Sequence, residues 1–106
     1  MAVVLCNASE VGDGKVVQVA RPGSSDDFLA VYNLGGKFYL TDDTCTHALA
    51  SLANGEVQDG KIFCPLHGGA FFIATGEAAE LPCTEPLKTY EIYEEAGVLY
   101  GVLEGA

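Results

Sequence analysis

The sequence has few basic side chains. Five lysines and arginines stand against 15 aspartates and glutamates, which gives a formal net charge of −10 at pH 7. Proteins that bind nucleic acid or anionic membranes use basic patches to neutralise phosphate. The composition therefore argues against both partners. It permits electrostatic steering toward basic proteins, although solubility alone explains most individual acids equally well.

Long apolar runs are also missing. Residues 1–6 are mostly apolar, but they have no basic flank and are too short to span a bilayer. We therefore expect no signal peptide, no membrane anchor and a cytoplasmic location. The length of 106 residues predicts one domain, 1–106, that buries roughly 60–70% of its unfolded surface.

The sequence lacks a glycine-rich nucleotide loop. No G-x-G-x-x-G stretch is present, and the chain is too short for a flavin or nicotinamide fold, so a reductase is excluded. The neighbouring acids Asp42 and Asp43 are candidates for acid–base chemistry. In a small acidic domain we expect such a pair to lie on the solvated surface. We therefore do not expect the chain to be an enzyme.

Only two histidines occur, and each lies close to a cysteine. They stand in Cys45-Thr46-His47 and, after an interval of 16 residues (48–63), in Cys64-Pro65-Leu66-His67. Two Cys and two His suit either structural zinc or an iron–sulfur centre. Zinc fingers usually take the Cys pair from one segment and the His pair from another, whereas here each segment supplies one of each. A Rieske 2Fe–2S centre, with two Cys on one iron and two His on the other, fits this order.

Two cysteines remain outside these segments. Cys6 and Cys83 could pair as one disulfide. Because we expect the chain in a reducing compartment, we predict two plain buried thiols instead.

The remaining chain has the patterns of β-structure. Apolar or alternating runs predict strands over 16–20, 28–34, 37–41, 61–64, 70–73, 88–93 and 98–103. Gly35-Gly36 predicts a tight hairpin, because primed turns need positive φ, and residues 94–97 predict a second one. Only residues 9–11 suggest a helical turn. We expect an all-β fold.

The two Cys/His segments resemble the cluster-binding boxes of the Rieske family. The second box continues into Gly68-Gly69, and Thr75-Gly76 and Leu81-Pro82 stand where that family has a further loop over the cluster. The resemblance runs from about Val31 to the C-terminus and is closest to the small ferredoxins of bacterial ring-hydroxylating dioxygenases. It implies a layered antiparallel β-sandwich. A basal part (about 1–44 and 84–106) carries an inserted cluster-binding part (about 45–83).

The resemblance further implies one Rieske-type 2Fe–2S cluster with Cys45, His47, Cys64 and His67 as ligands. A Rieske oxygenase needs a second iron held by two His and a carboxylate, and both histidines are already assigned. We therefore expect a monomeric one-electron carrier between a flavin-containing ferredoxin reductase, which uses NAD(P)H, and a terminal Rieske oxygenase for aromatic rings. Docking is expected at the cluster end, through the two histidines, Leu49, Leu66 and neighbouring apolar residues.

Two alternatives keep the same four ligands. One is an electron-relay subunit bound permanently in a larger enzyme such as nitrite reductase. The other is a structural zinc module without a redox role, which predicts a colourless protein with one metal ion.

The sequence also predicts the reduction potential of the cluster. High-potential Rieske proteins carry a disulfide Cys in each box, together with Ser and Tyr hydroxyls that donate to cluster and ligand sulfur; the matching positions here are Ala50, Leu66, Gly69 and Phe71. Fewer donors to sulfur make reduction less favourable. We expect a midpoint near the low end of the Rieske range, roughly −150 mV. A redox titration that gives a value above zero would contradict this.

Overall fold

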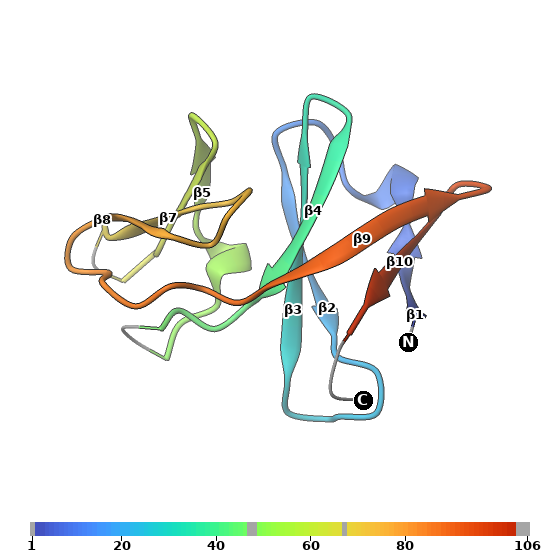
Figure 1. Ribbon diagram of the computed structural model, residues 1–106, viewed down its shortest axis with the longest axis horizontal. Helices are drawn as coiled ribbons and strands as arrows, with labels where there is room; N and C mark the ends of the chain where they lie inside the picture. Colours follow the sequence, from blue (N-terminus) through green and yellow to red (C-terminus); the bar gives the residue numbers. More distant parts are fainter. Residues whose placement is uncertain (1, 47–48, 67, 104–106) are drawn as a thin grey trace.

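Antiparallel β-strands dominate the computed structural model, which describes residues 2–46, 49–66 and 68–103 (Figure 1). One sheet has six strands in the order β1-β10-β9-β4-β3-β2, and the other has four in the order β5-β6-β7-β8. The strands of the larger sheet are β1 (Ala2–Asn7), β2 (Val16–Ala20), β3 (Phe28–Leu34), β4 (Lys37–Asp42), β9 (Thr89–Glu95) and β10 (Val98–Val102). Those of the smaller sheet are β5 (Glu56–Gln58), β6 (Lys61–Phe63), β7 (Ala70–Phe72) and β8 (Ala78–Glu80).

The predicted all-β class is confirmed. The strands expected from the sequence are all present, with ends that differ by two residues at most. Strands β1, β5 and β8 were not predicted. Helical structure in the described ranges is limited to two 3₁₀ turns, η1 (Ala8–Glu10) and η2 (Leu52–Asn54), so no helix there is long and apolar enough to cross a membrane.

Three hairpins use the same tight turn. Gly35 and Gly36 connect β3 to β4 with φ of 65° and 95°, as the sequence predicted. Ala96 and Gly97 connect β9 to β10, and Asp59 and Gly60 connect β5 to β6, again with positive φ at both positions. Two positive φ values match the right-handed twist of the flanking strands. Each turn therefore fixes the register of its pair.

Strand β3 is buried on both faces. Leu29 and Val31 pack into a cluster formed within the six-stranded sheet, whereas Ala30 and Tyr32 pack into a second cluster that includes residues of the smaller sheet. All four are fully buried. The first cluster consists of Leu5, Val11, Leu29, Val31, Leu40, Leu99 and Leu103. The second, called here the thiol cluster, consists of Ala30, Tyr32, Cys45, Leu52, Ile62, Cys64, Phe71, Ile73, Cys83 and Leu87.

The smaller sheet is inserted between two neighbouring strands of the larger one. The chain leaves the six-stranded sheet after β4, forms β5 to β8, and returns as β9 beside β4 (Figure 1). Strand β4 pairs with β9 through Leu40 with Tyr90 and Thr41 with Thr89. The inserted segment therefore begins and ends at adjacent points of the basal sheet.

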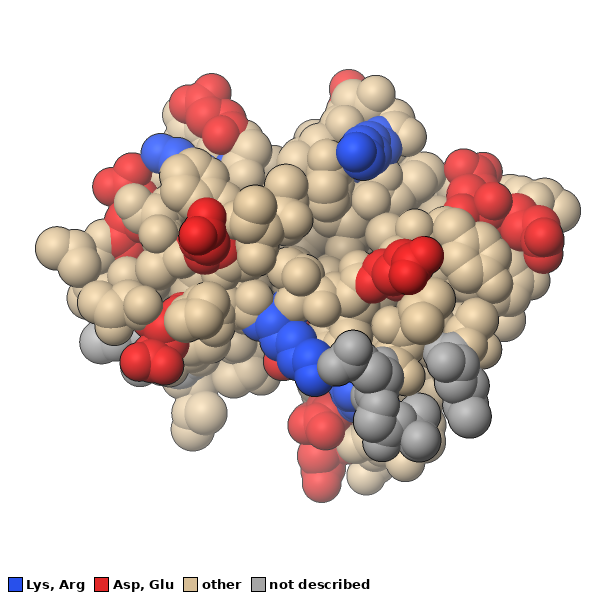
Figure 2. All heavy atoms as spheres, viewed as in Figure 1, with Lys and Arg blue, Asp and Glu red and all other residues tan. Residues whose placement is uncertain are grey.

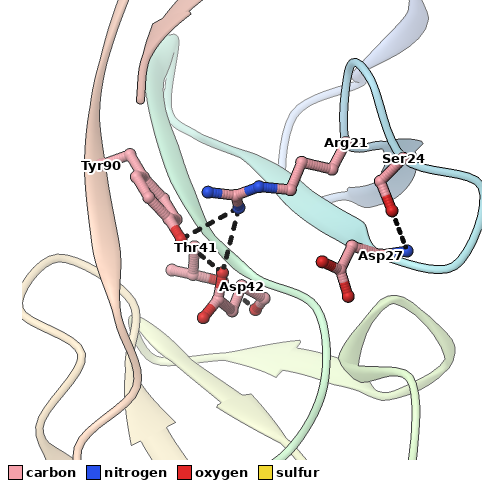
Figure 3. A network of polar contacts seen from close by, with 6 residues as sticks. All are labelled: Arg21, Ser24, Asp27, Thr41, Asp42 and Tyr90. Carbon is pink, nitrogen blue, oxygen red and sulfur yellow. Dashed lines mark hydrogen bonds and ion pairs between the residues drawn. The ribbon is translucent and has the colours of Figure 1, made fainter. Parts of the chain in front are cut away.

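A polar network closes this junction (Figure 3). The Tyr90 hydroxyl donates to Asp42 Oδ1 at 2.6 Å, Arg21 Nη1 donates to the Tyr90 hydroxyl oxygen at 3.2 Å, and Arg21 lies 3.8 Å from the Asp42 carboxylate. Burial and the hydrogen bond to Asp42 raise the pKa of Tyr90, so its hydroxyl remains a donor at neutral pH. The network joins the ends of β2 and β4 to the start of β9.

Asp43 corrects the expectation of a solvated acid pair. It is only 2% exposed, because its side chain is used to hold the loop that follows β4. Asp43 Oδ1 accepts from the Ala53 N–H at 2.9 Å, Oδ2 accepts from Gln18 Nε2 at 2.8 Å, and the Asp43 carbonyl accepts from the Leu52 N–H at 2.7 Å. Its role is structural, since these bonds fasten residues 43–53 to β2.

Asp43→Ala tests this role. It leaves the Ala53 N–H without its acceptor and removes the bond to Gln18, so we expect a loss of about 1–3 kcal/mol in unfolding free energy. Chemical denaturation of the loaded protein measures it. Asp26→Ala is the matched control, because Asp26 is exposed and its carboxylate makes no hydrogen bond within ranges 2–46, 49–66 and 68–103. Equal stability of the two variants would contradict the assignment.

Candidate metal centre

The two cysteines of the Cys/His segments stand at the bases of two matching loops. The Cys45 N–H donates to the Ala50 carbonyl at 3.0 Å, and the Cys64 N–H donates to the Gly69 carbonyl at 2.7 Å. Each bond closes a six-residue loop, 45–50 or 64–69. A bridge between Thr44 and Ser51 extends the first closure by one residue on each side. The two loops therefore present their cysteines in equivalent positions.

The structure brings Cys45 and Cys64 together in the interior. Each is 3% exposed, and both belong to the thiol cluster. His47 and His67, the other two predicted ligands, lie outside the described residues. Among the described residues, no three His, Cys, Asp or Glu side chains form a group that could hold a metal ion.

A third cysteine lies at the same place. Cys83 is 2% exposed and belongs to the thiol cluster, as Cys45 and Cys64 do. Burial, followed by the negative charge of the Cys45 thiolate, raises the pKa of Cys83 to about 12. The four cysteines form no disulfide, as expected. Cys6 is only half-buried, and it packs against the first apolar cluster, that of the six-stranded sheet.

The sequence did not identify Cys83 as part of the site. It gave Cys83 only as a buried thiol, although the residue directly follows Leu81-Pro82, which the Rieske resemblance places over the cluster. Its position next to Leu81-Pro82 was the signal in the sequence that could have placed Cys83 at the site.

The segment that carries Cys83 is tied to the rest of the site at two points. Thr46 Oγ1 donates to the Glu85 carbonyl at 2.9 Å, which joins this segment to the first loop. The Leu87 N–H donates to the Gly76 carbonyl at 2.6 Å, and a Cβ on Gly76 would overlap the Leu87 carbonyl oxygen. Glycine at 76 thus permits the close approach that holds residues 83–87 against the smaller sheet.

The residues around the second loop have separate tasks. Gly68 has φ of 74°, a conformation that glycine adopts without strain, and Gly69 is buried and closes the loop through its carbonyl. Phe71 is fully buried within the thiol cluster, so the position matching the donor Tyr of high-potential Rieske proteins holds an apolar ring.

Leucines point outward from all three segments. Leu49, Leu66 and Leu81 are 96%, 67% and 78% exposed, and they are called here the loop leucines. Exposed leucines are common one at a time, but three from segments that meet at one buried cluster form an apolar feature of a kind often used for docking. Pro82, which the resemblance placed with Leu81 in the shielding loop, is partly buried.

Acidic side chains are spread over the visible face of the molecule, whereas basic ones are few and separate (Figure 2). Strand β9 of the six-stranded sheet carries three acids, Glu91, Glu94 and Glu95.

Comparison with known proteins identifies the family. The family model described as the Rieske [2Fe-2S] domain matches residues 1–91. This chain belongs to the Rieske family. The family's cofactor, a Rieske-type 2Fe–2S cluster, is therefore the cofactor of this chain.

Two relatives are ferredoxins by name. Ferredoxin CarAc of Metapseudomonas resinovorans is 45% identical over 96 residues, which cover 91% of this chain and 88% of that protein. The 3-phenylpropionate/cinnamic acid dioxygenase ferredoxin subunit of Escherichia coli strain K12 is 33% identical over 99 residues, which cover 92% of this chain and 90% of that subunit.

Solved structures of ferredoxins have the same fold as this chain. The ferredoxin of Sphingomonas yanoikuyae B1 superposes with a TM-score of 0.87 at 41% identity, covering 93% of this chain and 95% of its own. A chain in the complex of reduced oxygenase and oxidised ferredoxin of carbazole 1,9a-dioxygenase gives 0.86 at 43% identity, covering 94% and 91%. A nitrite reductase small subunit from Mycobacterium tuberculosis gives 0.82 at 16% identity, covering 95% and 93%, which shows a shared fold only.

The residues present fit this cofactor. Two thiols from separate loops meet in an apolar interior, and each loop has a histidine in its sequence between the cysteine and the residue that closes it. Low exposure of the sulfurs suits thiolate ligands of a cluster that must be kept from water.

Proposed function

We propose that this chain is a one-electron carrier of an aromatic-ring-hydroxylating dioxygenase system. It takes electrons from a flavin-containing reductase that uses NAD(P)H and passes them to the Rieske centre of the terminal oxygenase. Cys45 and Cys64 bind the cluster through sulfur, and His47 and His67 bind it through nitrogen. The protein acts as a monomer in the cytoplasm, and it is not itself an enzyme.

The observation that carries this proposal is the buried thiol pair at the bases of two equivalent loops. When bound between them, the cluster supplies a site that accepts and releases one electron. The protein's own part is to fix the ligands and exclude water, because both sulfurs lie in the apolar thiol cluster. The relatives named as ferredoxins of dioxygenases support the choice of partners.

We further propose one domain in two parts, with the basal part at about 1–44 and 84–106 and the cluster-binding part at about 45–83. The strand positions support this division, since β5 to β8 all fall in the second part.

The loop leucines are the proposed docking surface for the oxygenase. Electron transfer needs a short distance between the two centres, so contact should occur where the ligand loops reach the surface. Leu49 lies two residues beyond His47, and Leu66 directly precedes His67. A small apolar contact in an acidic protein suits a weak interface that exchanges rapidly.

Iron, zinc and sulfide analysis with EPR tests the cofactor and its ligands. The anaerobically purified protein should contain about two irons and two sulfides per chain, be EPR-silent when oxidised, and give a rhombic signal of low average g after dithionite. Cys45→Ser and Cys64→Ser should lose this signal, whereas Cys6→Ser should keep it. One zinc per chain and no EPR signal would establish a structural metal module instead.

Electron delivery tests the docking surface. Leu49→Glu and Leu66→Glu should each slow reduction of the partner oxygenase by about fivefold or more, since an apolar contact is replaced by a charge that must be desolvated. Stopped-flow spectroscopy with the reduced carrier measures the rate. The cluster spectrum should not change, because both side chains are exposed.

Val4→Glu is the matched control for these variants. Val4 is also an exposed apolar residue, at 60%, but it lies on edge strand β1 of the other sheet. Equal rates for all three variants would contradict docking at the loop leucines.

A further inference from the structure

One side of strands β1, β10 and β9 carries an apolar row in contact with solvent. Val4 pairs with Tyr100, and Tyr100 pairs with Tyr93, so the three side chains lie side by side on one face of the sheet. Val4 is 60% exposed and Tyr93 is 41% exposed, whereas Leu99, the neighbour of Tyr100 in β10, is buried in the first cluster. The outer side is called here the tyrosine face, and it consists of Val4, Tyr93, Val98, Tyr100 and Val102.

The two tyrosines form the rigid centre of the tyrosine face. Their rings stack with centroids 5.3 Å apart and an interplanar angle of 13°. Cross-strand aromatic pairs also stabilise sheets, so the stacking has a structural value of its own. Two rings that already hold one another lose little side-chain freedom when a protein covers them, and tyrosine is enriched at such contacts. The pair therefore has the properties of an anchor in a protein interface.

The charge beside the tyrosine face is of one sign. Glu91 is exposed and pairs with Val102, and Glu95 is likewise exposed in β9, at the end of the strand. Figure 2 shows acidic side chains at the end of the molecule where Figure 1 places the β9–β10 hairpin. None of the five lysines and arginines lies in β1, β9 or β10. A complementary surface therefore has an apolar centre and lysine or arginine side chains at its margin.

A second copy of this chain does not have that chemistry. Each copy has a net charge of −10, and strands β1, β9 and β10 of a second copy offer no base to Glu91 or Glu95. The β9–β10 hairpin also lies at the opposite end of the long axis from the smaller sheet (Figure 1). A basic partner on the tyrosine face therefore leaves the ligand loop between β6 and β7 uncovered.

We propose that the tyrosine face is an anchoring surface for the flavin reductase, which contacts it through an apolar centre and a basic margin. The inference rests on the proposed function, in which the loop leucines are assigned to the oxygenase. Affinity that is added for one partner only lets the carrier distinguish the two. The electron passes from the reduced flavin to the cluster at the ligand loops, where the distance is short, and no bond forms or breaks at the tyrosine face.

Steady-state reduction of the loaded carrier by the reductase with NAD(P)H tests the apolar part of the surface. Tyr93→Ser and Val4→Ser should each raise the KM for the carrier about threefold or more, because each removes apolar contact area. The kcat should not change, since neither variant alters the place where the electron enters. Reduction of the oxygenase by the prereduced variants should keep the rate of the unsubstituted carrier, which a damaged fold or cluster would not allow.

Glu95→Gln and Asp26→Asn test the acidic margin as a matched pair. Each variant removes one exposed carboxylate, but Asp26 lies in the loop between β2 and β3. Glu95→Gln should raise the KM for the carrier about twofold at low ionic strength and less at high salt, because salt screens the attraction to a basic partner. Asp26→Asn should leave the KM unchanged.

Three results would overturn the inference while leaving the proposed function intact. The first is an unchanged KM in Tyr93→Ser and Val4→Ser, and the second is an equal slowing of the oxygenase step in these variants. The third is an equal rise of KM in Glu95→Gln and Asp26→Asn, which would reflect total charge alone. If Tyr93→Ser does not fold, Val4→Ser on edge strand β1 decides the apolar part. Failure of the reductase to reduce the unsubstituted, loaded carrier would instead reject the proposed function.

Discussion

The double-sided burial of β3 is the constraint on which the rest of the structure depends. Most strands of a small antiparallel sheet have one face toward water, but alternate residues of β3 contact two different apolar clusters. Leu29 and Val31 stabilise the basal sheet, and Ala30 and Tyr32 stabilise the cluster that contains the three thiols. The ligand loops are thus packed onto a strand in the middle of the fold. A site built in this way is preorganised and needs little rearrangement when its charge changes by one unit.

Each of the two ligand loops places a buried cysteine and an exposed leucine within a few residues of each other. Because each cysteine N–H bonds to a carbonyl five residues on, the loop turns back on itself and the thiol stays at its buried base. The same turn leaves Leu49 and Leu66 outside. One local backbone pattern, used twice, therefore supplies both the ligands for the cofactor and the apolar surface that we assign to docking.

The sequence was informative where the signal is local. The Cys/His boxes, the Gly35-Gly36 turn and the apolar runs of the longer strands each occupy a few consecutive residues, and the structure agrees with the turn and the strands. Strands β5 and β8, with three residues each, are too short to show a period. The pair Asp59-Gly60 is a recognised hairpin signal and would have revealed β5.

The errors concern residues whose surroundings come from distant parts of the chain. Asp43 was expected on the surface because charge usually lies there, yet its acceptors are satisfied by Gln18 and Ala53, 25 and 10 residues away. Cys83 is buried and free of a disulfide, as predicted, but the sequence did not indicate that Cys45 and Cys64 belong to the same apolar cluster. No window of sequence contains such contacts, since they exist only after the inserted sheet has packed against β3.

Surface charges and buried dipoles affect the reduction potential of the cluster to different extents. The 15 acids would disfavour reduction if they acted at full strength, but exposed carboxylates interact through water and salt, which screen them beyond about 8 Å at physiological ionic strength. A dipole buried beside a ligand sulfur is not screened in this way. Groups buried beside Cys45 and Cys64 therefore weigh more in the redox balance than the acids on the surface do. Acidic residues remain free to vary with the needs of solubility and partner encounter, while the potential is fixed from within.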